Sequence, residues 1–494
     1  MMNAFFVRSL GFFIASYDLM IMNVVNILLS EQYGSSVYTS SMKSAVSAAA
    51  LIGAGVGQML FGVLGDTFGR RPNMIASCVL LIVGSAFCAC AYGGSPQGTL
   101  WVLVAARGLL GIGVGGEYPL SASATAEDSP TTEIRSHRVA LNFALQGVGS
   151  QTASLLGMVL IWALANEDKG KNDPTRLEIV WRLLLGVGML PACFLLYYRL
   201  RAKETVPFKA AQKRRIEAER CGLKGSASLG FVLKNYYSAL LGTAGTWFLF
   251  DIAFYAQNMF SATLLTVIGV SDTTSLRVAS TENAFVALLA LPGYYVAVFF
   301  INTLGRRRIQ MQGFAFMTVL FLCLATLWDD LGNNAVAFIL LYGLALFFAN
   351  FGPNMSTFVL PTEMYPTPIR CTCFGFSAAC GKAGAAIGSL GFGIWASDEG
   401  FGYASAFFVF AGITLLAMPL TWFFLQDSEL TVAEIDDEFF ELLNDDDDAS
   451  SLGPSAMEDF TFGVTPNGVS GRFVAMLANQ KTSGPQRRAV APYF

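Results

Sequence analysis

The chain has 494 residues; 54% are hydrophobic, 13% are charged, and the mean hydropathy is +0.53. Soluble globular domains carry about 25% charged residues, so this composition excludes one soluble core and favours an all-α protein that crosses a membrane many times. The formal net charge of −4 hides an uneven distribution, because the acids collect in the C-terminal tail and the basic residues in short loops.

Twelve apolar runs predict twelve transmembrane helices, since about 20 apolar residues span a bilayer as one helix. The first run contains Asp18 and is not followed by a clean cleavage site, so we expect a retained helix and not a signal peptide. Six runs precede a polar interval and six follow it: 9–30, 43–64, 73–93, 99–125, 139–166 and 180–199, then 236–268, 284–303, 309–328, 334–360, 372–396 and 402–425.

The polar interval is rich in lysine and arginine, which by the positive-inside rule places it in the cytoplasm. The arginines after the second and eighth helices then fall on the same side, so we expect both termini to be cytoplasmic, in a protein of the plasma membrane. The acidic tail is predicted to be disordered beyond a short first helix. The expected parts are an N-terminal six-helix half (1–200), a basic linker (201–235), a C-terminal six-helix half (236–426) and the tail (427–494).

The two halves share loop markers at a constant offset of 236 residues. Asp66-Thr-Phe-Gly-Arg70-Arg71 matches Asn302-Thr-Leu-Gly-Arg306-Arg307, and Glu127 matches Glu363 at the same offset. A duplicated six-helix half is typical of transporters whose halves rock about a central site.

These paired loops are predicted to act as gates and not to bind substrate. Asp66, Arg70 and Arg71 can form ion pairs and helix caps that hold one state closed, although the arginines could also serve only to anchor topology. Two further pairs are expected to latch neighbouring helix ends: Glu127 with Arg135, and Glu363 with Arg370.

One carboxylate, Glu117, stands out because it lies in a long run of apolar or small residues, beside Tyr118 and four glycines. An acid inside a membrane is costly and is by default a functional candidate, although it could simply pair within a packing helix. Asp18 in helix 1 and Asp251 in helix 7 share this character. We expect all three acids to take up and release protons as a central cavity alternates between the two faces.

Other polar residues near mid-membrane suggest the ligand of that cavity. Lys382 in helix 11 would be unnecessary for a neutral sugar but supplies the charge that a small anion requires, unless it snorkels to the interface. Directional donors are expected from Tyr118, Gln146, Trp247, Tyr255 and Asn354. No catalytic triad, metal cluster or nucleotide fingerprint is found, so we expect no enzyme activity, no cofactor, no metal site and no nucleic-acid partner.

Several segments together resemble the phosphate:proton symporter family of the major facilitator superfamily, over nearly all of residues 9–440. They are Tyr17-Asp18-Leu19, Gly65 to Arg71, Gly115-Gly-Glu-Tyr-Pro-Leu-Ser121, Gln146-Gly147, Trp247 to Tyr255, Pro292-Gly-Tyr294, Phe347 to Asn354 and Gly381-Lys-Ala-Gly384. The resemblance implies that Tyr118, Gln146, Trp247, Asp251, Tyr255, Asn354 and Lys382 hold phosphate, and that Asp18, Glu117 and Asp251 handle the coupling cation.

Two departures from the family pattern bear on coupling. Family members often carry an acid three residues before the helix-1 aspartate, where this chain has Ala15, and many have aspartate where it has Glu117. The resemblance implies H⁺ as the coupling ion, and the missing acid at Ala15 leaves Na⁺ as the alternative.

The resulting hypothesis is a secondary active importer of inorganic phosphate that works by alternating access in the lipid bilayer. Two alternatives remain at this point. One is a permease for an organic phosphate or another oxyanion, and the other is a phosphate receptor that signals through its tail without net transport.

Overall fold

The computed structural model describes residues 4–165, 167–168, 171–221, 225–267, 275–332, 334–395 and 402–451. The predicted disorder of the distal tail, 452–494, lies outside the described residues. The described part is almost entirely helical, and its one hairpin pairs β1 (Glu167–Asp168) with β2 (Lys171–Asn172) in antiparallel register.

The first half of the chain forms six spans from eight helices. They are α1 (Ala4–Met20), α2 (Met22–Val37), α3 (Ser40–Phe68), α4 (Arg70–Ala89), α5 (Pro96–Glu127), α6 (Thr132–Leu164), α7 (Pro174–Val187) and α8 (Met189–Arg201). The apolar run 9–30 is divided near Ile21 into α1 and α2, and the run 180–199 is divided at Gly188 into α7 and α8.

The second half repeats this arrangement. It consists of α10 (Leu229–Val267), α11 (Leu276–Leu304), α12 (Arg306–Thr326), α13 (Trp328–Leu331), α14 (Ala335–Ala349), η1 (Asn350–Asn354), α15 (Met355–Met364), α16 (Arg370–Trp395) and α17 (Gly402–Phe424). Among the described residues, eleven helical segments are long and apolar enough to cross a membrane. The twelfth span is α16, whose 26 residues pack beside α3 and α10.

The tenth span is broken at its centre by η1, a π-helical turn. Pro353 lacks a backbone N–H, and Gly352 leaves helical geometry with φ −158° and ψ −125°. The Gln312 amide donates to the Phe351 carbonyl that this break frees. The break therefore sets the direction in which Asn354 projects, and π-turns of this kind are frequent at functional sites.

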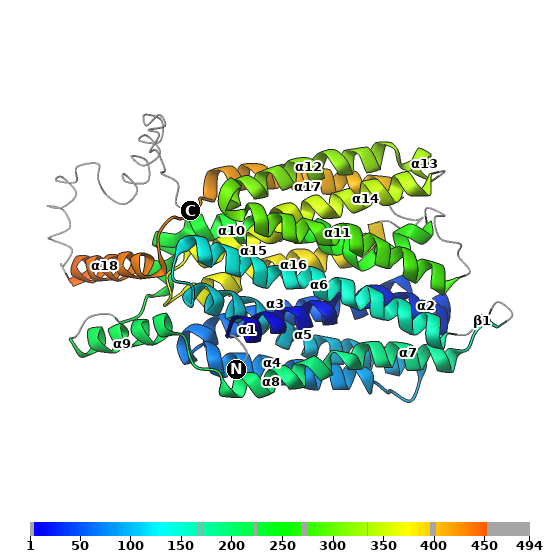
Figure 1. Cartoon of the computed structure of the whole chain (residues 1–494), viewed down its shortest axis with the longest axis horizontal. Coiled ribbons are helices and arrows are strands. Elements are labelled where there is room, and N and C mark those ends of the chain that lie inside the picture. Colours follow the sequence, from blue (N-terminus) through cyan, green and yellow to red (C-terminus); the bar gives the residue numbers. More distant parts are fainter. Residues whose placement is uncertain are drawn as a thin grey trace, which may run out of the picture.

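The two halves lie side by side, with α3 and α6 of the first facing α16 and α11 of the second (Figure 1). Gly62 and Gly375 let α3 and α16 approach closely, because a Cβ on Gly375 would lie 2.3 Å from the Gln58 carbonyl oxygen. We call the end of the bundle from which α9 (Val206–Arg220) and α18 (Val432–Ser451) project the α18 end, and the other the β-hairpin end (Figure 1).

The duplicated loops fold alike. Gly69 and Gly305 both have positive φ, 103° and 85°, and each directly precedes the helix that begins with Arg70 or Arg306. A left-handed residue is needed to turn the chain sharply from one span into the next, and glycine takes that conformation without a Cβ clash. The repeat read from the sequence is thus also a repeat of backbone geometry.

Two segments are more ordered than their composition suggests. The basic interval between the halves contains the helix α9, and the acidic tail begins with α18, which is 20 residues long. Phe439 and Leu443 of α18 pack against Phe231 and Tyr365, and the Asp436 carboxylate accepts a hydrogen bond of 2.6 Å from the Thr367 amide. The first part of the tail therefore packs against the bundle.

Candidate functional site

A buried lysine forms the centre of the candidate site. Lys382 Nζ on α16 lies 3.0 Å from Asp251 Oδ2 and 2.9 Å from the Tyr255 hydroxyl, both on α10 and one helical turn apart. Its ammonium group also stands 4.3 Å from the centre of the Tyr255 ring, close enough for a cation–π interaction. Lys382 is 1% exposed, so it does not snorkel to an interface.

The same lysine reaches the other half of the bundle through Tyr118 of α5. The Tyr118 ring centre is 4.9 Å from Lys382 Nζ, and its hydroxyl is 3.4 Å from that of Tyr255. Trp247 lies one turn before Asp251, beside that carboxylate, and its ring lies 6.5 Å from the Tyr118 ring. Five of the seven predicted phosphate residues thus form one cluster where the halves meet.

The other two predicted residues lie in a second cluster beside it. Asn354 Nδ2 donates to the Tyr294 hydroxyl at 2.9 Å and to Asn350 Oδ1 at 2.8 Å. The Gln146 side chain also reaches Tyr294, and its Oε1 has no hydrogen-bond partner among the described residues. Tyr294, which bridges the halves here, was not predicted as a site residue, although it stands in one of the resembling segments.

A cluster of aromatic rings from both halves packs against Tyr118. Phe12 packs on Tyr118 with 4.7 Å between ring centres, and Phe143 packs on Phe358 at 4.6 Å. Both halves contribute, since Phe12 and Phe143 belong to α1 and α6 and Phe358 to α15. The rings therefore form a further contact between the halves beside Tyr118.

Glu117 faces away from the central cluster. Its carboxylate forms a bidentate pair with Arg199 of α8, at 2.5 and 2.6 Å, and accepts from Ser77 at 2.7 Å. Sequence reasoning missed this Arg199 contact, because Arg199 lies at the end of an apolar run that borders the basic linker. Glu117 is thus buried within the first half. The expectation that it belongs to the central cavity together with Tyr118 is wrong.

Asp18 also lies inside the first half. Its carboxylate packs against Gly188, at the break between α7 and α8, and Ser85 donates to it at 3.4 Å. Arg107 donates to the Asp18 carbonyl at 2.6 Å. Of the three predicted acids, only Asp251 contacts Lys382.

At the α18 end, a charged network joins the halves. Arg70 pairs with Glu127 at 2.7 Å and donates to the Thr367 carbonyl at 2.9 Å, and Glu127 lies 3.3 Å from Arg370 of the other half. The Asp66 carboxylate accepts from the backbone amides of Cys371 and Thr372 at 3.2 and 2.7 Å, and so caps the first turn of α16.

The predicted latches Glu127–Arg135 and Glu363–Arg370 are wrong, because the partners are exchanged. Glu127 pairs with Arg70 and Arg370, whereas Glu363 pairs with Arg306 at 2.5 Å. Arg135 faces Glu363 electrostatically, but its guanidinium forms no hydrogen bond with any described residue. Each acid thus bonds the loop arginine of its own half and lies nearest the helix-end arginine of the other.

Arg71 does not join the halves. Its guanidinium donates to the Leu200 carbonyl at 2.7 Å and its amide to Glu204 at 2.9 Å, so it caps the end of α8. Arg307 makes the equivalent contacts with Trp422 and Asp427 in the second half. This capping role fits the alternative of an arginine that fixes local structure.

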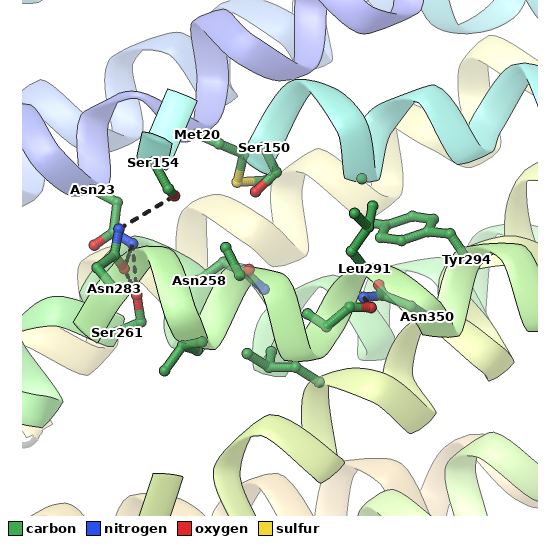
Figure 2. A pocket seen from close by; sticks show the side chains of 15 residues that line it. Met20, Asn23, Ser150, Ser154, Asn258, Ser261, Asn283, Leu291, Tyr294 and Asn350 are labelled. Atoms are coloured by element: carbon green, nitrogen blue, oxygen red, sulfur yellow. Dashed lines mark hydrogen bonds between the residues drawn. The ribbon is translucent and has the colours of Figure 1, made fainter. Parts of the chain in front are cut away.

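At the β-hairpin end, an uncharged cluster joins the halves. Asn23 of α2 donates to Ser261 and Asn283 at 2.6 and 2.7 Å, and Asn283 donates to Ser154 of α6 at 3.3 Å (Figure 2). Beneath it lies a cavity of about 30 Å³, bordered by Tyr294 and Asn350. That volume holds one or two water molecules, and the halves are thus joined by side-chain contacts at both ends of the described bundle.

No cluster of three or more His, Cys, Asp or Glu side chains suited to a metal occurs in the described part of the chain. The charged groups of the site are instead matched with one another. The arrangement can therefore bind an anion if the anion takes the place of Asp251 as the partner of Lys382. This exchange needs only Lys382 and its neighbours.

Comparisons with known proteins agree with this architecture. The model of the family "Sugar (and other) transporter" matches residues 4–230 and again 227–439. The chain is 33% identical to "Probable inorganic phosphate transporter 1-6" of Arabidopsis thaliana over 88% of this chain and 93% of that protein. It is also 33% identical to "Low affinity inorganic phosphate transporter 3" of Petunia hybrida, over 79% and 81%.

Solved structures show the same fold. A structure of the proton:xylose symporter XylE of the major facilitator superfamily superimposes with a TM-score of 0.72 at 20% identity, covering 88% of this chain and 98% of that one. A partially occluded inward-open structure of XylE from E. coli gives a TM-score of 0.67 at 18% identity, covering 86% and 98%. Twelve spans in two pseudo-symmetric halves are the common architecture.

Proposed function

The chain belongs to the sugar (and other) transporter family, within it to the phosphate:proton symporters of the major facilitator superfamily, and we propose that it imports inorganic phosphate with protons by alternating access. The observation that carries the proposal is the buried Lys382, paired with Asp251 and approached by Tyr118 from the other half. A positive charge held between two moving halves is suited to a small anion. The names of the relatives support phosphate as that anion.

Coupling follows from the Lys382–Asp251 pair. While Asp251 is ionised it neutralises Lys382, and an incoming phosphate would have to compete with it. A proton on Asp251 frees the ammonium group, which then binds the phosphate with a charge-assisted hydrogen bond. Proton and phosphate therefore bind together and leave together, which is what symport requires.

The remaining residues complete the substrate site once it opens. Tyr118, Tyr255 and Trp247 surround Lys382, and Gln146 and Asn354 offer amides from the neighbouring cluster. We assign Asp18 and Glu117 a supporting part in proton transfer within the first half, where Arg107 and Arg199 accompany them.

The gates follow the same logic. We place the α18 end in the cytoplasm of a plasma-membrane protein, with both termini on that side, because the basic linker lies there. Asp66, Arg70, Glu127 and Arg370, with Arg306 and Glu363, hold that end closed, and Arg71 and Arg135 support it.

Uptake of radiolabelled phosphate into proteoliposomes tests the function. We expect concentrative uptake driven by an inward proton gradient and none with a sodium gradient alone. Uptake with a sodium gradient alone would identify Na⁺, and not H⁺, as the coupling ion. Phosphate binding without uptake under either gradient would favour a receptor. Arsenate should compete with phosphate, whereas glycerophosphodiesters should not; the reverse would indicate an organic phosphate permease.

A further inference from the structure

The uncharged cluster at the β-hairpin end is not explained by phosphate binding at Lys382. We propose that phosphate enters the protein through the cavity beneath this cluster, and that Asn23, Ser261 and Asn283 are the gate it opens and its first contacts inside the protein. This inference rests on the proposed import of phosphate and adds the entry route and the residues that control it.

The contacts of the cluster indicate a gate, because they cross between the halves. Asn23 comes from the first half, whereas Ser261 and Asn283 come from α10 and α11 of the second. Asn283 also accepts from Ser261 at 2.8 Å and donates back to Ser154 of the first half. The halves cannot separate at this end until these bonds break.

The position of the cavity indicates an entry route. Tyr294 and Asn350 border it at one end and also bond Asn354 in the candidate phosphate site, while the Asn23 cluster closes it at the other (Figure 2). An ion that passes the cluster therefore arrives directly at residues that face the substrate site. At about 30 Å³ the cavity is too small for phosphate in this state, so entry requires the gate to open.

The chemistry of the cavity wall suits the passage of a protonated oxyanion. None of the described side chains that border it is charged. Amides and hydroxyls donate to phosphate oxygens and also accept from a P–OH group, so they can replace the hydration of either. Without a fixed positive charge they do not retain the anion, which moves on to Lys382.

Asn283→Asp is the sharpest test of the route, since it changes charge with almost no change in shape. A fixed negative charge beside the path repels an anion strongly where water is scarce, so we expect the half-saturation concentration for phosphate uptake to rise at least tenfold. Asn334→Asp is the matched control. Asn334 caps α14 and is exposed outside the cavity, so that variant should transport like the wild type. An unchanged half-saturation concentration in Asn283→Asp would overturn the route.

A second measurement reads the gate without phosphate. Ser150 borders the cavity below the cluster, and Ser150→Cys places a thiol there. In intact cells or right-side-out vesicles, a membrane-impermeant thiol reagent should label this introduced thiol at least ten times faster when Asn283→Ala or Asn23→Ala is added, and no faster with Asn334→Ala. Labelling is followed on the peptide that carries the introduced thiol, because the chain has other exposed cysteines.

The two arms separate the possible failures. If the wild type takes up no phosphate but Asn283→Ala or Asn23→Ala speeds the labelling, the proposed substrate is wrong and the proposed gate is supported. If the wild type transports phosphate and neither gate variant speeds the labelling, the gate is overturned and the proposed function is unaffected. Both alanine variants remove one side chain each, so a folding defect in one leaves the other to decide.

Discussion

Lys382 and Asp251 neutralise each other in the closed state, and their separation is the chemical event on which the proposed transport depends. Charges buried in a membrane are tolerated when they are paired, and here each is almost completely buried. Phosphate and a proton together supply the same two charges that the pair supplies alone. The site can therefore be empty or doubly occupied at low cost, but not half occupied.

Asp251→Asn tests this exchange directly. The amide keeps the shape of the side chain but cannot carry a proton, so we expect accumulation of phosphate against its gradient to be lost. Exchange of external for internal phosphate should continue, because Lys382 is still present. The measurement is radiolabelled net uptake beside counterflow in the same vesicles, and undiminished accumulation would remove Asp251 from coupling.

Lys382→Gln tests the anion site. A hydrogen bond to a charged group contributes about 1.5–3 kcal/mol, and each 1.4 kcal/mol is tenfold in affinity. We expect the half-saturation concentration for phosphate exchange to rise about 10- to 100-fold. Lys209→Gln on α9, an exposed residue far from the site, is the control. Equal values for the two variants would place Lys382 outside the binding site.

The residues of the substrate cluster were predictable from the sequence, but their pairing was not. Lys382, Asp251, Tyr255 and Tyr118 could be recognised because polar side chains are rare inside apolar helices. Pairing depends on which helix faces touch, and this is why Glu117 was expected in the cavity when it bonds Arg199. The Asn23 cluster was missed because uncharged amides and hydroxyls do not stand out.

At the scale of elements, the breaks in the spans position the site more than the spans themselves. The π-turn η1 orients Asn354, and the break at Gly188 makes room for the Asp18 carboxylate. Hydropathy located every span, because a continuous apolar run is a strong signal. It did not locate the break at Gly188, since an apolar run stays apolar across a kink, whereas Pro353 marks the break at η1 in the sequence. Hydropathy also predicted the run 99–125 where α5 extends from Pro96 to Glu127.

The charged network at the α18 end can be tested with a cysteine that the chain already carries. Cys371 is completely buried, next to Arg370 at the start of α16. Glu127→Gln weakens the bonds to Arg70 and Arg370, and breaking a buried ion pair costs about 3–5 kcal/mol, so the closed state should be less populated. We expect alkylation of Cys371 to accelerate at least tenfold.

The control for this experiment is Glu178→Gln, which breaks a partly exposed pair with Arg182 at the opposite end of the first half. Exposed pairs contribute little, so Cys371 should stay protected. If both variants leave the alkylation rate at the wild-type value, the network is not a gate.

The docking of α18 is expected to depend on pH. Burial raises the pKa of the Asp436 carboxyl above its ordinary value, and this outweighs the opposing effects of Arg370 and the Thr367 amide. The docked helix therefore binds a proton more tightly than the free one. Docking should be strongest at low pH and should weaken as the pH rises through the raised pKa.

Spin-label distances between α18 and α10, measured upward from about pH 4, near the ordinary pKa of an aspartate, follow this docking. In Asp436→Asn the side chain still accepts from Thr367 but cannot ionise, so the distances should lose this pH dependence. Asp437→Asn, which removes an exposed pair with Arg214, should keep it. Identical pH profiles in the two variants would contradict the assignment to Asp436.

At the scale of the whole molecule, ion pairs join the halves at the α18 end. At the β-hairpin end they are joined by the uncharged Asn23 cluster and by Arg277, which contacts the Ala165 carbonyl and the Trp162 ring. The duplicated architecture was predictable, because repeated loop motifs at a constant offset survive in the sequence. The exchange of partners between Glu127 and Glu363 was not, since it arises only when the two halves are placed together.

A truncation that tests the role of the tail should remove the residues after α18 and keep α18 itself. Asp427 caps the loop at Arg307, and Asp436 bonds Thr367 beside the charged network, so a chain that ends at Gln426 loses both contacts. We expect that chain to melt at a lower temperature and to expose Cys371. A chain that ends at Ser451 should keep wild-type phosphate uptake; loss of uptake there would point to an essential role for residues 452–494.

The contrast between the two ends has a consequence for the surroundings in which the protein works. Dissolved salt weakens exposed ion pairs over a Debye length of about 8 Å at physiological ionic strength, but it screens buried pairs much less. Arg70, Glu127 and Arg370 are almost completely buried while that end is closed. In the proposed orientation this network faces the cytosol and the Asn23 cluster faces the outside. Dissolved ions reach the charges of the network only after the cytoplasmic end has opened. Salt should therefore act on the cytoplasmic network mainly after it has opened, by screening the attraction that draws the separated charges back together.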